Sequence, residues 1–160
     1  MTQVGRPFPT IASGDVAPDF TLHDQNNEEI ALRRYRGDRA VLVIFYPLAF
    51  TGVCTGELAR VRDDLDTFQN DDVQTLAISV DSVYAHKIFA EREGYDFPLL
   101  SDFWPHGAVA ASFGAFDTDT GVANRGTYLV DRSGIVRYTE LNRPGQPRNA
   151  DDWVAAITAL

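Results

Sequence analysis

The segment 40-AVLVIFY-46 is the most apolar run of the chain, and Pro47 follows it directly. The run is continuous and rich in β-branched and aromatic residues, which is typical of a central strand buried on both faces. A second run of this kind, 73-VQTLAISV-80, lies further along the chain. Because strands buried on both faces need covering layers, the two runs predict an α/β domain with the sheet at its centre.

Helical patterns follow both runs. Between residues 54 and 68, apolar residues recur at helical spacing at Leu58, Val61, Leu65 and Phe68. Residues 82–93 predict a second helix, with Tyr84 and Ile88 four residues apart and Gly94 as its C-cap. Strand, helix, strand and helix in this order indicate parallel strands joined by crossover helices.

The remaining segments add strands at both ends of the sheet. We expect a hairpin over 19–32, a short strand at 97–100, a short helix at 106–113, a second hairpin over 127–140 and a final helix with Trp153, Ile157 and Leu160 on one face. This order resembles a thioredoxin-like three-layer sandwich, with a mixed central sheet, flanking helices and an N-terminal hairpin.

Composition indicates one globular domain. The 160 residues are 44% hydrophobic and 23% charged, and we predict a single domain over 14–160 behind an irregular arm at 1–13. The net charge of -9 argues against a nucleic-acid partner. No apolar segment approaches the 18 residues of a membrane span, and the first residues lack the apolar run of a signal peptide. We therefore expect a cytoplasmic protein.

Cys54 is the only cysteine, so no disulfide can form within these 160 residues, which suits a reducing compartment. It follows the first buried run by eight residues and opens a predicted helix. Sites in α/β folds form beyond the carboxyl ends of strands, and unpaired N–H groups at a helix start stabilise a thiolate. Thr51 is expected either to cap this helix or to face the sulfur. Position alone does not separate a reactive cysteine from an inert core residue.

Four segments carry a family resemblance. The spacing 47-PLAFTGVC-54 fits the pattern Pro-x-x-x-Thr-x-x-Cys. VAPDF (16–20), SDFWPHGAVA (101–110) and 122-VANRGTYLVDRSGIVR-137 each resemble family segments, and they occur in the order expected. From about residue 14 to its end, the chain is similar to the AhpE-type one-cysteine peroxiredoxins of actinobacteria, which belong to the alkyl hydroperoxide reductase and thiol-specific antioxidant family. These are thiol peroxidases on a thioredoxin-type fold.

The resemblance implies that Cys54 is the peroxidatic nucleophile and becomes a sulfenic acid. Hydrogen peroxide, organic hydroperoxides and peroxynitrite are the candidate substrates. Pro47, Thr51 and Arg125 match the family's other active-site positions. Arg125 and the Thr51 hydroxyl are expected to donate hydrogen bonds to the reacting oxygens, and Pro47 to shield the sulfur.

Recycling of the sulfenic acid needs an outside thiol, because the chain has no second cysteine. The resemblance suggests mycothiol with mycoredoxin, or a thioredoxin-like donor, and a homodimer formed through the face beside the active site. No cofactor is expected, since Gly-rich phosphate motifs are absent, and the scattered histidines predict no metal site. Whether Glu57, Trp104 or His106 contributes to the site is left open.

Three other functions compete with the peroxidase. A thioredoxin-fold binding protein or holdase would carry Cys54 incidentally. A cysteine hydrolase would need a histidine beside Cys54, and no motif places one there. A thiol–disulfide oxidoreductase is disfavoured because no CxxC motif is present.

Overall fold

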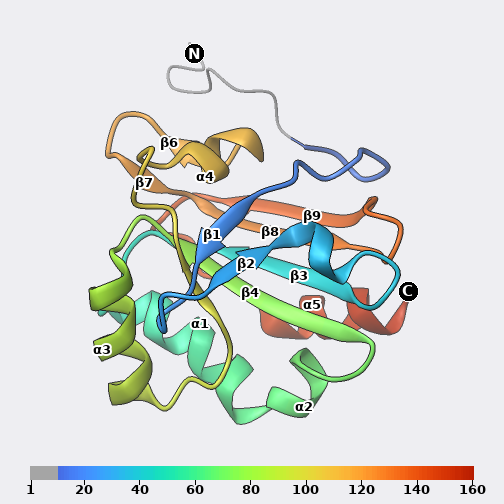
Figure 1. Cartoon of the computed structure of the whole chain (residues 1–160), viewed down its shortest axis with the longest axis horizontal. Helices are drawn as coiled ribbons and strands as arrows, with labels where there is room; N and C mark the ends of the chain where they lie inside the picture. The colour runs from blue at the N-terminus through green and yellow to red at the C-terminus, as the bar shows by residue number, and fades with distance from the viewer. Residues whose placement is uncertain (1–10) are drawn as a thin grey trace.

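β3 (Ala40–Phe45) lies inside a mixed sheet of seven strands, and all six of its residues are buried. The computed structural model describes residues 11–160, and Figure 1 shows the sheet with helices around it. The strand order is β2-β1-β5-β4-β3-β8-β9. The predicted central strand is therefore confirmed, and so is the mixed α/β sandwich.

Parallel and antiparallel pairing meet at β3. β4 (Val73–Ser79) pairs with it in parallel, and β8 (Arg125–Val130) pairs with it antiparallel on the other side. β5 (Leu99–Ser101) extends the parallel part and β9 (Val136–Asn142) extends the antiparallel part. The carboxyl ends of β3 and β4 therefore lie at the same edge as the beginning of β8.

The N-terminal hairpin is also confirmed. β1 (Thr21–His23) and β2 (Glu29–Ala31) pair antiparallel, and β1 joins the sheet at β5. Leu32–Tyr35 then form a 3-10 helix, η1, which the sequence pattern did not predict. The predicted arm at 1–13 lies largely outside the described residues, so the arm and the domain boundary stay predictions.

Alternate residues of β3 point to the two faces of the sheet, as the period of a strand requires. Leu42 and Ile44 join a core cluster with α1 (Gly52–Asp63), α3 (Val83–Glu93) and α5 (Ala150–Thr158). Val41 and Val43 face the opposite cluster, which includes α4 (Ala108–Ser112). Figure 1 shows α1, α2 (Leu65–Phe68) and α5 together on one side of the sheet and α4 on the other.

Three helix predictions differ from the structure. Leu160, predicted on the apolar face of the final helix, lies beyond the end of α5 and is exposed. The predicted helix over 54–68 begins at Gly52 and is interrupted at Asp64, where ψ is 38° and the backbone leaves the helical region, so that α2 (Leu65–Phe68) is a separate turn. In α3, Tyr84 and Ile88 face outward while Phe89 and Ala90 are buried. Gly94 ends α3 in the left-handed conformation, φ 72°, as predicted.

The short pair β6 (Phe116–Asp117) and β7 (Val122–Ala123) was not predicted either. Two-residue strands are too short to show a period in sequence. Within residues 11–160, no helix has both the length and the apolar character that crossing a bilayer requires.

Candidate active site

The loop 47–51 connects the end of β3 to the beginning of α1. Pro47 is buried, whereas Phe50 is exposed and has a positive φ of 68°. A bulky residue in this conformation costs of order 1–3 kcal/mol and persists only where its surroundings hold it. The Phe50 ring lies 5.0 Å from that of Phe89, centroid to centroid. The loop thus stores strain directly before the predicted nucleophile.

Thr51 is the N-cap residue of α1, with extended backbone, but its side chain makes no capping hydrogen bond. The hydroxyl instead donates to the carbonyl oxygen of Leu48, at 2.9 Å. The predicted capping role for this side chain is therefore wrong. Its position at the beginning of α1, three residues before the cysteine, is as expected.

Cys54 is the third residue of α1 and is fully buried, with 0% exposure. Its side chain belongs to the core cluster that also contains Tyr46, Ala49 and Leu58. Because it sits in the first turn of α1, the unpaired N–H groups of the helix start favour a negative sulfur. A bulky molecule cannot touch this sulfur unless the loop or the first turn of α1 moves.

Arg125 is the first residue of β8 and is 3% exposed. The register pairs Ile44 with Thr127, so Arg125 lies level with the end of β3 and the beginning of the loop. Its Nη1 donates to Glu57 Oε1 at 2.7 Å, and its Nε donates to the Pro144 carbonyl at 2.6 Å. The antiparallel strand therefore brings this arginine to the end of the sheet where Cys54 lies.

Arg148 is a second buried arginine that sequence reasoning missed. Its Nε and Nη2 donate to the two carboxylate oxygens of Glu57, at 3.0 and 2.8 Å, and its backbone N–H donates to the same carboxylate at 2.8 Å. Its Nη1 donates to the carbonyl of Gly126 and the hydroxyl of Thr127, each at 3.0 Å. It comes from 143-RPGQPRNA-150, a segment without periodicity or motif.

Glu57 joins these two arginines to the helix that carries the thiol. Three residues after Cys54, it shares that face of α1. Burial alone would raise the pKa of Glu57, but the hydrogen bonds and charge of Arg148, with Arg125 beside it, outweigh burial and lower the pKa. Two guanidinium groups against one carboxylate leave one net positive charge buried at Glu57, on the helix that carries Cys54.

In the part of the chain that the structure describes, Trp104 and His106 make no hydrogen bond, ion pair or ring contact with Glu57, Arg125 or Arg148. Trp104 is exposed at the surface, and the His106 Nε2 lies 2.7 Å from the carbonyl oxygen of Gly121. His86 is buried behind the loop instead, against Tyr46. Within residues 11–160, no three His, Cys, Asp or Glu side chains are grouped to hold a metal ion.

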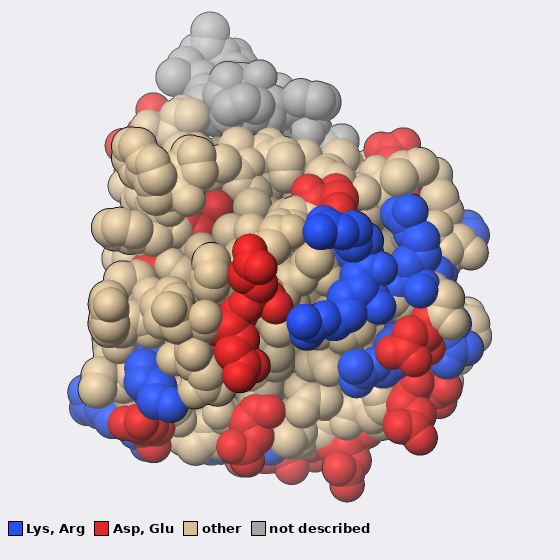
Figure 2. All heavy atoms as spheres, viewed as in Figure 1, with Lys and Arg blue, Asp and Glu red and all other residues tan. Residues whose placement is uncertain are grey.

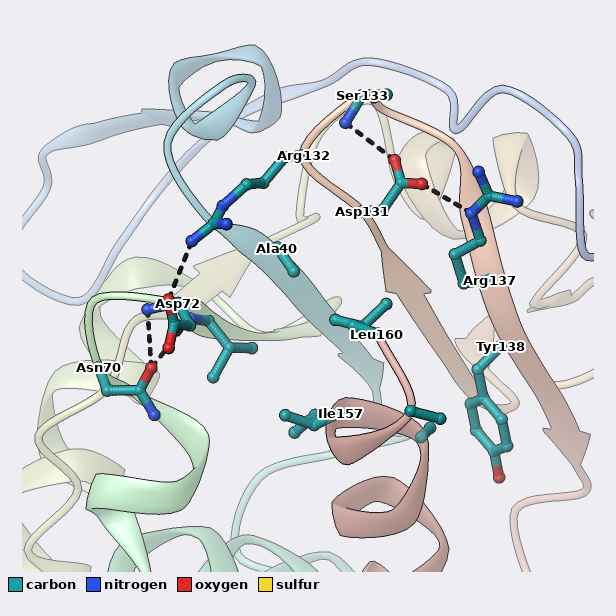
Figure 3. Close-up of a pocket in the computed structure, with 13 residues that line it drawn as sticks. Ala40, Asn70, Asp72, Asp131, Arg132, Ser133, Arg137, Tyr138, Ile157 and Leu160 are labelled. Atoms are coloured by element: carbon teal, nitrogen blue, oxygen red, sulfur yellow. Dashed lines mark hydrogen bonds and ion pairs between the residues drawn. The ribbon is translucent and has the colours of Figure 1, made fainter.

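A hollow on the described surface lies elsewhere. It has a volume of about 940 Å³, and Ala40, which begins β3, lines it, so it is at the opposite end of that strand from Cys54. Figure 3 shows ion pairs of Arg132 with Asp72 and of Arg137 with Asp131 at its rim. None of the predicted site residues lines this hollow, and we place the candidate active site at the loop.

The fold and this cluster together define a class: a thioredoxin-like domain with one buried thiol in the first turn of a helix, next to a carboxylate that pairs two arginines. The chain belongs to the AhpC/TSA family, whose pattern it matches over residues 13–139.

Named relatives agree with this assignment. The chain is 55% identical to alkyl hydroperoxide reductase E of Mycobacterium tuberculosis, over 92% of this chain and 96% of that protein. It is 32% identical to the chloroplastic 2-Cys peroxiredoxin BAS1 of Hordeum vulgare, over 92% and 74%. Among solved structures, peroxidoxin BcpB of Mycobacterium tuberculosis superposes with a TM-score of 0.82, at 32% identity and over 92% and 97% of the two chains.

Proposed function

We propose that this protein is a thiol-dependent peroxidase in which Cys54 is the nucleophile. The observation that carries the proposal is the buried Cys54 in the first turn of α1, beside the positively charged cluster of Glu57, Arg125 and Arg148. The thiolate attacks one oxygen of a hydroperoxide, the O–O bond breaks, and the departing oxygen takes up a proton. The products are a sulfenic acid at Cys54 and water or an alcohol.

Thiolate formation supplies only part of such a reaction. A thiol with an ordinary pKa of about 8.5 is ~3% ionised at pH 7, so complete ionisation gains about 30-fold. Further acceleration needs donors that follow the negative charge from sulfur to the departing oxygen. Arg125 is suited to this because its guanidinium stays charged and is fixed by Glu57.

Pro47 and Thr51 complete the proposed site. Pro47 is buried at the beginning of the loop, where it removes one backbone donor and limits access of water to the sulfur. The Thr51 hydroxyl donates to Leu48 in this structure, so it reaches a bound peroxide only after turning away from that carbonyl. Arg125 is therefore the donor already fixed in place, and Thr51 the one that responds to substrate.

Direct oxidation tests the proposal. Reduced protein mixed with equimolar hydrogen peroxide should gain one oxygen atom in its intact mass, and a sulfenate-specific reagent should trap the product. Cys54→Ser should show neither change. A wild-type thiol that stays unmodified after minutes in excess peroxide would refute the peroxidase and favour the binding protein or holdase, for which Cys54→Ser leaves function intact.

Measuring the rate of Cys54 oxidation by cumene hydroperoxide and by peroxynitrite, as well as by hydrogen peroxide, ranks the three candidate substrate classes. The buried sulfur favours small peroxides, because a bulky group must displace the loop to reach it. A faster reaction with the larger hydroperoxide would show that the loop opens readily.

An external thiol is expected to return the sulfenic acid to the thiol, since the chain contains one cysteine. Mycothiol with mycoredoxin and a thioredoxin-like protein are the two donors we propose, in a reducing cytoplasm. Adding each donor to the isolated sulfenic form and following the loss of one oxygen by mass distinguishes them. Recovery with neither donor would reject both.

We also propose a homodimer through the face beside the active site. Exposed apolar side chains gather in the loop, on α3 and after β5, namely Leu48, Phe50, Val53, Tyr84, Ile88, Phe103 and Trp104. Figure 2 shows few charged residues along the left side of that view, over β6, α4 and the upper part of α3. Exposed apolar side chains with few charges around them are typical of a subunit interface.

A further inference from the structure

A chain of polar side chains, buried except for the partly exposed Asp81, lies behind the active-site loop, at the ends of β3 and β4. We call Tyr46, Ser79, Asp81 and His86 the Asp81 network. The Ser79 hydroxyl donates to Asp81 Oδ2 at 2.5 Å, and His86 Nε2 lies 2.7 Å from Ser79 Oγ and 2.9 Å from Tyr46 Oη. The His86 imidazole and the hydroxyls of Ser79 and Tyr46 are buried, so the contacts between them are made without competition from water.

The network reaches the loop through one backbone hydrogen bond. Asp81 Oδ2 accepts from the N–H of Ala49, at 2.8 Å. Ala49 directly precedes Phe50, the residue with positive φ, and Thr51 follows. A strained backbone keeps its conformation only where neighbouring groups hold it. Asp81 therefore holds the loop on the inner side, while the contact between the rings of Phe50 and Phe89 holds it on the outer side.

We propose that Asp81 is a positioning residue for the oxidation of Cys54: through Ala49 it fixes the loop so that Pro47 and Thr51 face the sulfur. Ser79 and His86 hold the Asp81 carboxylate in place. The inference rests on the proposed peroxidase function and adds a residue that does not touch the substrate.

Ser79 connects the imidazole of His86 to Asp81. Its hydroxyl donates to Asp81 Oδ2, and its oxygen lies 2.7 Å from His86 Nε2. The backbone N–H of Asp81 also donates to Ser79 Oγ, at 3.2 Å. Burial, opposed by the Asp81 charge, lowers the pKa of His86 to about 4, so the ring is neutral at pH 7.

Two substitutions at Asp81 separate positioning from charge. Ser79 and Ala49 both bond to Oδ2, so the amide oxygen of Asp81→Asn can accept both hydrogen bonds without the charge. Asp81→Ala removes both. The second-order rate of Cys54 oxidation by hydrogen peroxide is measured against pH, together with the thiolate absorbance at each pH. If Asp81 positions the loop, its loss lowers the plateau of the rate–pH curve, which is reached when the thiol is fully ionised. If only its charge matters, its loss moves the midpoint of that curve and leaves the plateau unchanged.

We expect Asp81→Ala to lower the plateau about tenfold or more and Asp81→Asn to keep it within about threefold of wild type. Ser79→Ala removes the hydrogen bond to the Asp81 carboxylate and changes the side-chain volume little, so it should lower the plateau by an intermediate factor. If Asp81→Ala does not fold, Ser79→Ala provides the test of the proposal. Asp131→Ala is the matched control, since Asp131 also accepts from backbone N–H groups and its side chain is 19% exposed against 15% for Asp81. It lies at the opposite end of β3 and should leave the plateau unchanged.

Unchanged plateaus in folded Asp81→Ala and Ser79→Ala would overturn the inference while leaving the peroxidase intact. An equal loss of the plateau in Asp81→Asn and Asp81→Ala would also overturn it, because the two hydrogen bonds that Asn can keep would then make no difference to the rate. A wild-type thiol that does not react would reject the proposed function, and this inference with it.

Discussion

At the scale of single residues, the carboxylate of Glu57 is the most consequential group of the candidate site. Its side chain and those of Arg125 and Arg148 are no more than 5% exposed. Replacing Glu57 by Gln leaves two buried guanidinium groups without an anion, which should lower the free energy of unfolding by about 3–5 kcal/mol. Urea unfolding under reducing conditions measures this.

Asp72→Asn is the control for the Glu57 prediction. Asp72 pairs with Arg132 at the surface, where ion pairs contribute about 0–1 kcal/mol. A loss as small for Glu57→Gln as for Asp72→Asn would mean that the two buried arginines find compensation elsewhere.

Arg125 is expected to act on the transition state and not only on the thiol. Arg125→Ala should therefore slow the oxidation of Cys54 by more than the ~30-fold that complete loss of thiolate stabilisation explains. Stopped-flow measurement of the second-order rate with hydrogen peroxide checks this, with Arg132→Ala as an exposed control. A loss below that limit, recovered at high pH, would restrict Arg125 to stabilising the thiolate.

His86 predicts a particular dependence of stability on pH. Burial lowers its pKa from 6.5 to about 4 in the folded protein. The unfolded chain therefore binds a proton first, and stability is lost as the pH falls from about 6.5 to about 4, by up to roughly 3 kcal/mol. Urea unfolding across this range should show the loss in wild type and a flatter profile in His86→Gln. Equal slopes would show that another group carries the effect.

At the scale of elements, a glycine inside a helix and a glycine at a helix C-cap should respond in opposite directions to substitution by Ala. Gly56 lies inside α1 with nothing within 4 Å of an added Cβ, so Gly56→Ala should stabilise by about 0.5–1 kcal/mol. Gly94 has φ 72° at the end of α3, so Gly94→Ala should destabilise by about 1–2 kcal/mol although its Cβ has room. Thermal unfolding compares them. A stabilising Gly94→Ala would contradict the left-handed C-cap.

Elements were predictable where local pattern and tertiary burial agree. β3 was recognised because each of its residues is apolar and the structure buries them all. The pair Tyr84 and Ile88 indicated the helix but not its buried face, because apolar spacing does not distinguish a core face from an exposed face. The loop 143-RPGQPRNA-150 has no period, so nothing in it distinguished Arg148 from a solvated arginine. Cys54, Pro47, Thr51 and Arg125 are predicted site residues from the motif and the spacing of their segments, and their roles stay predictions.

At the scale of the whole molecule, access to the sulfur is the main constraint. Cys54 is fully buried, and the outside thiol that recycles it must nevertheless form a bond with that sulfur. The strained loop at Phe50 and the short first turn of α1 are the segments whose movement exposes it. The contacts that position the loop for oxidation therefore oppose recycling, and mutations that loosen the loop should separate the two half-reactions.

The exposed apolar face on α3 predicts how the molecule associates. Ile88 shares this face with Tyr84, one helical turn away, and is 52% exposed. If the face is the subunit interface, Ile88→Asp buries an unpaired charge in every dimer and should shift the protein to monomers at micromolar concentration. Leu160→Asp is the matched control, because Leu160 is 54% exposed and lines the hollow at the opposite end of β3. Sedimentation velocity should give a monomer for Ile88→Asp and a dimer for wild type and Leu160→Asp, and a dimer for all three would place the interface elsewhere.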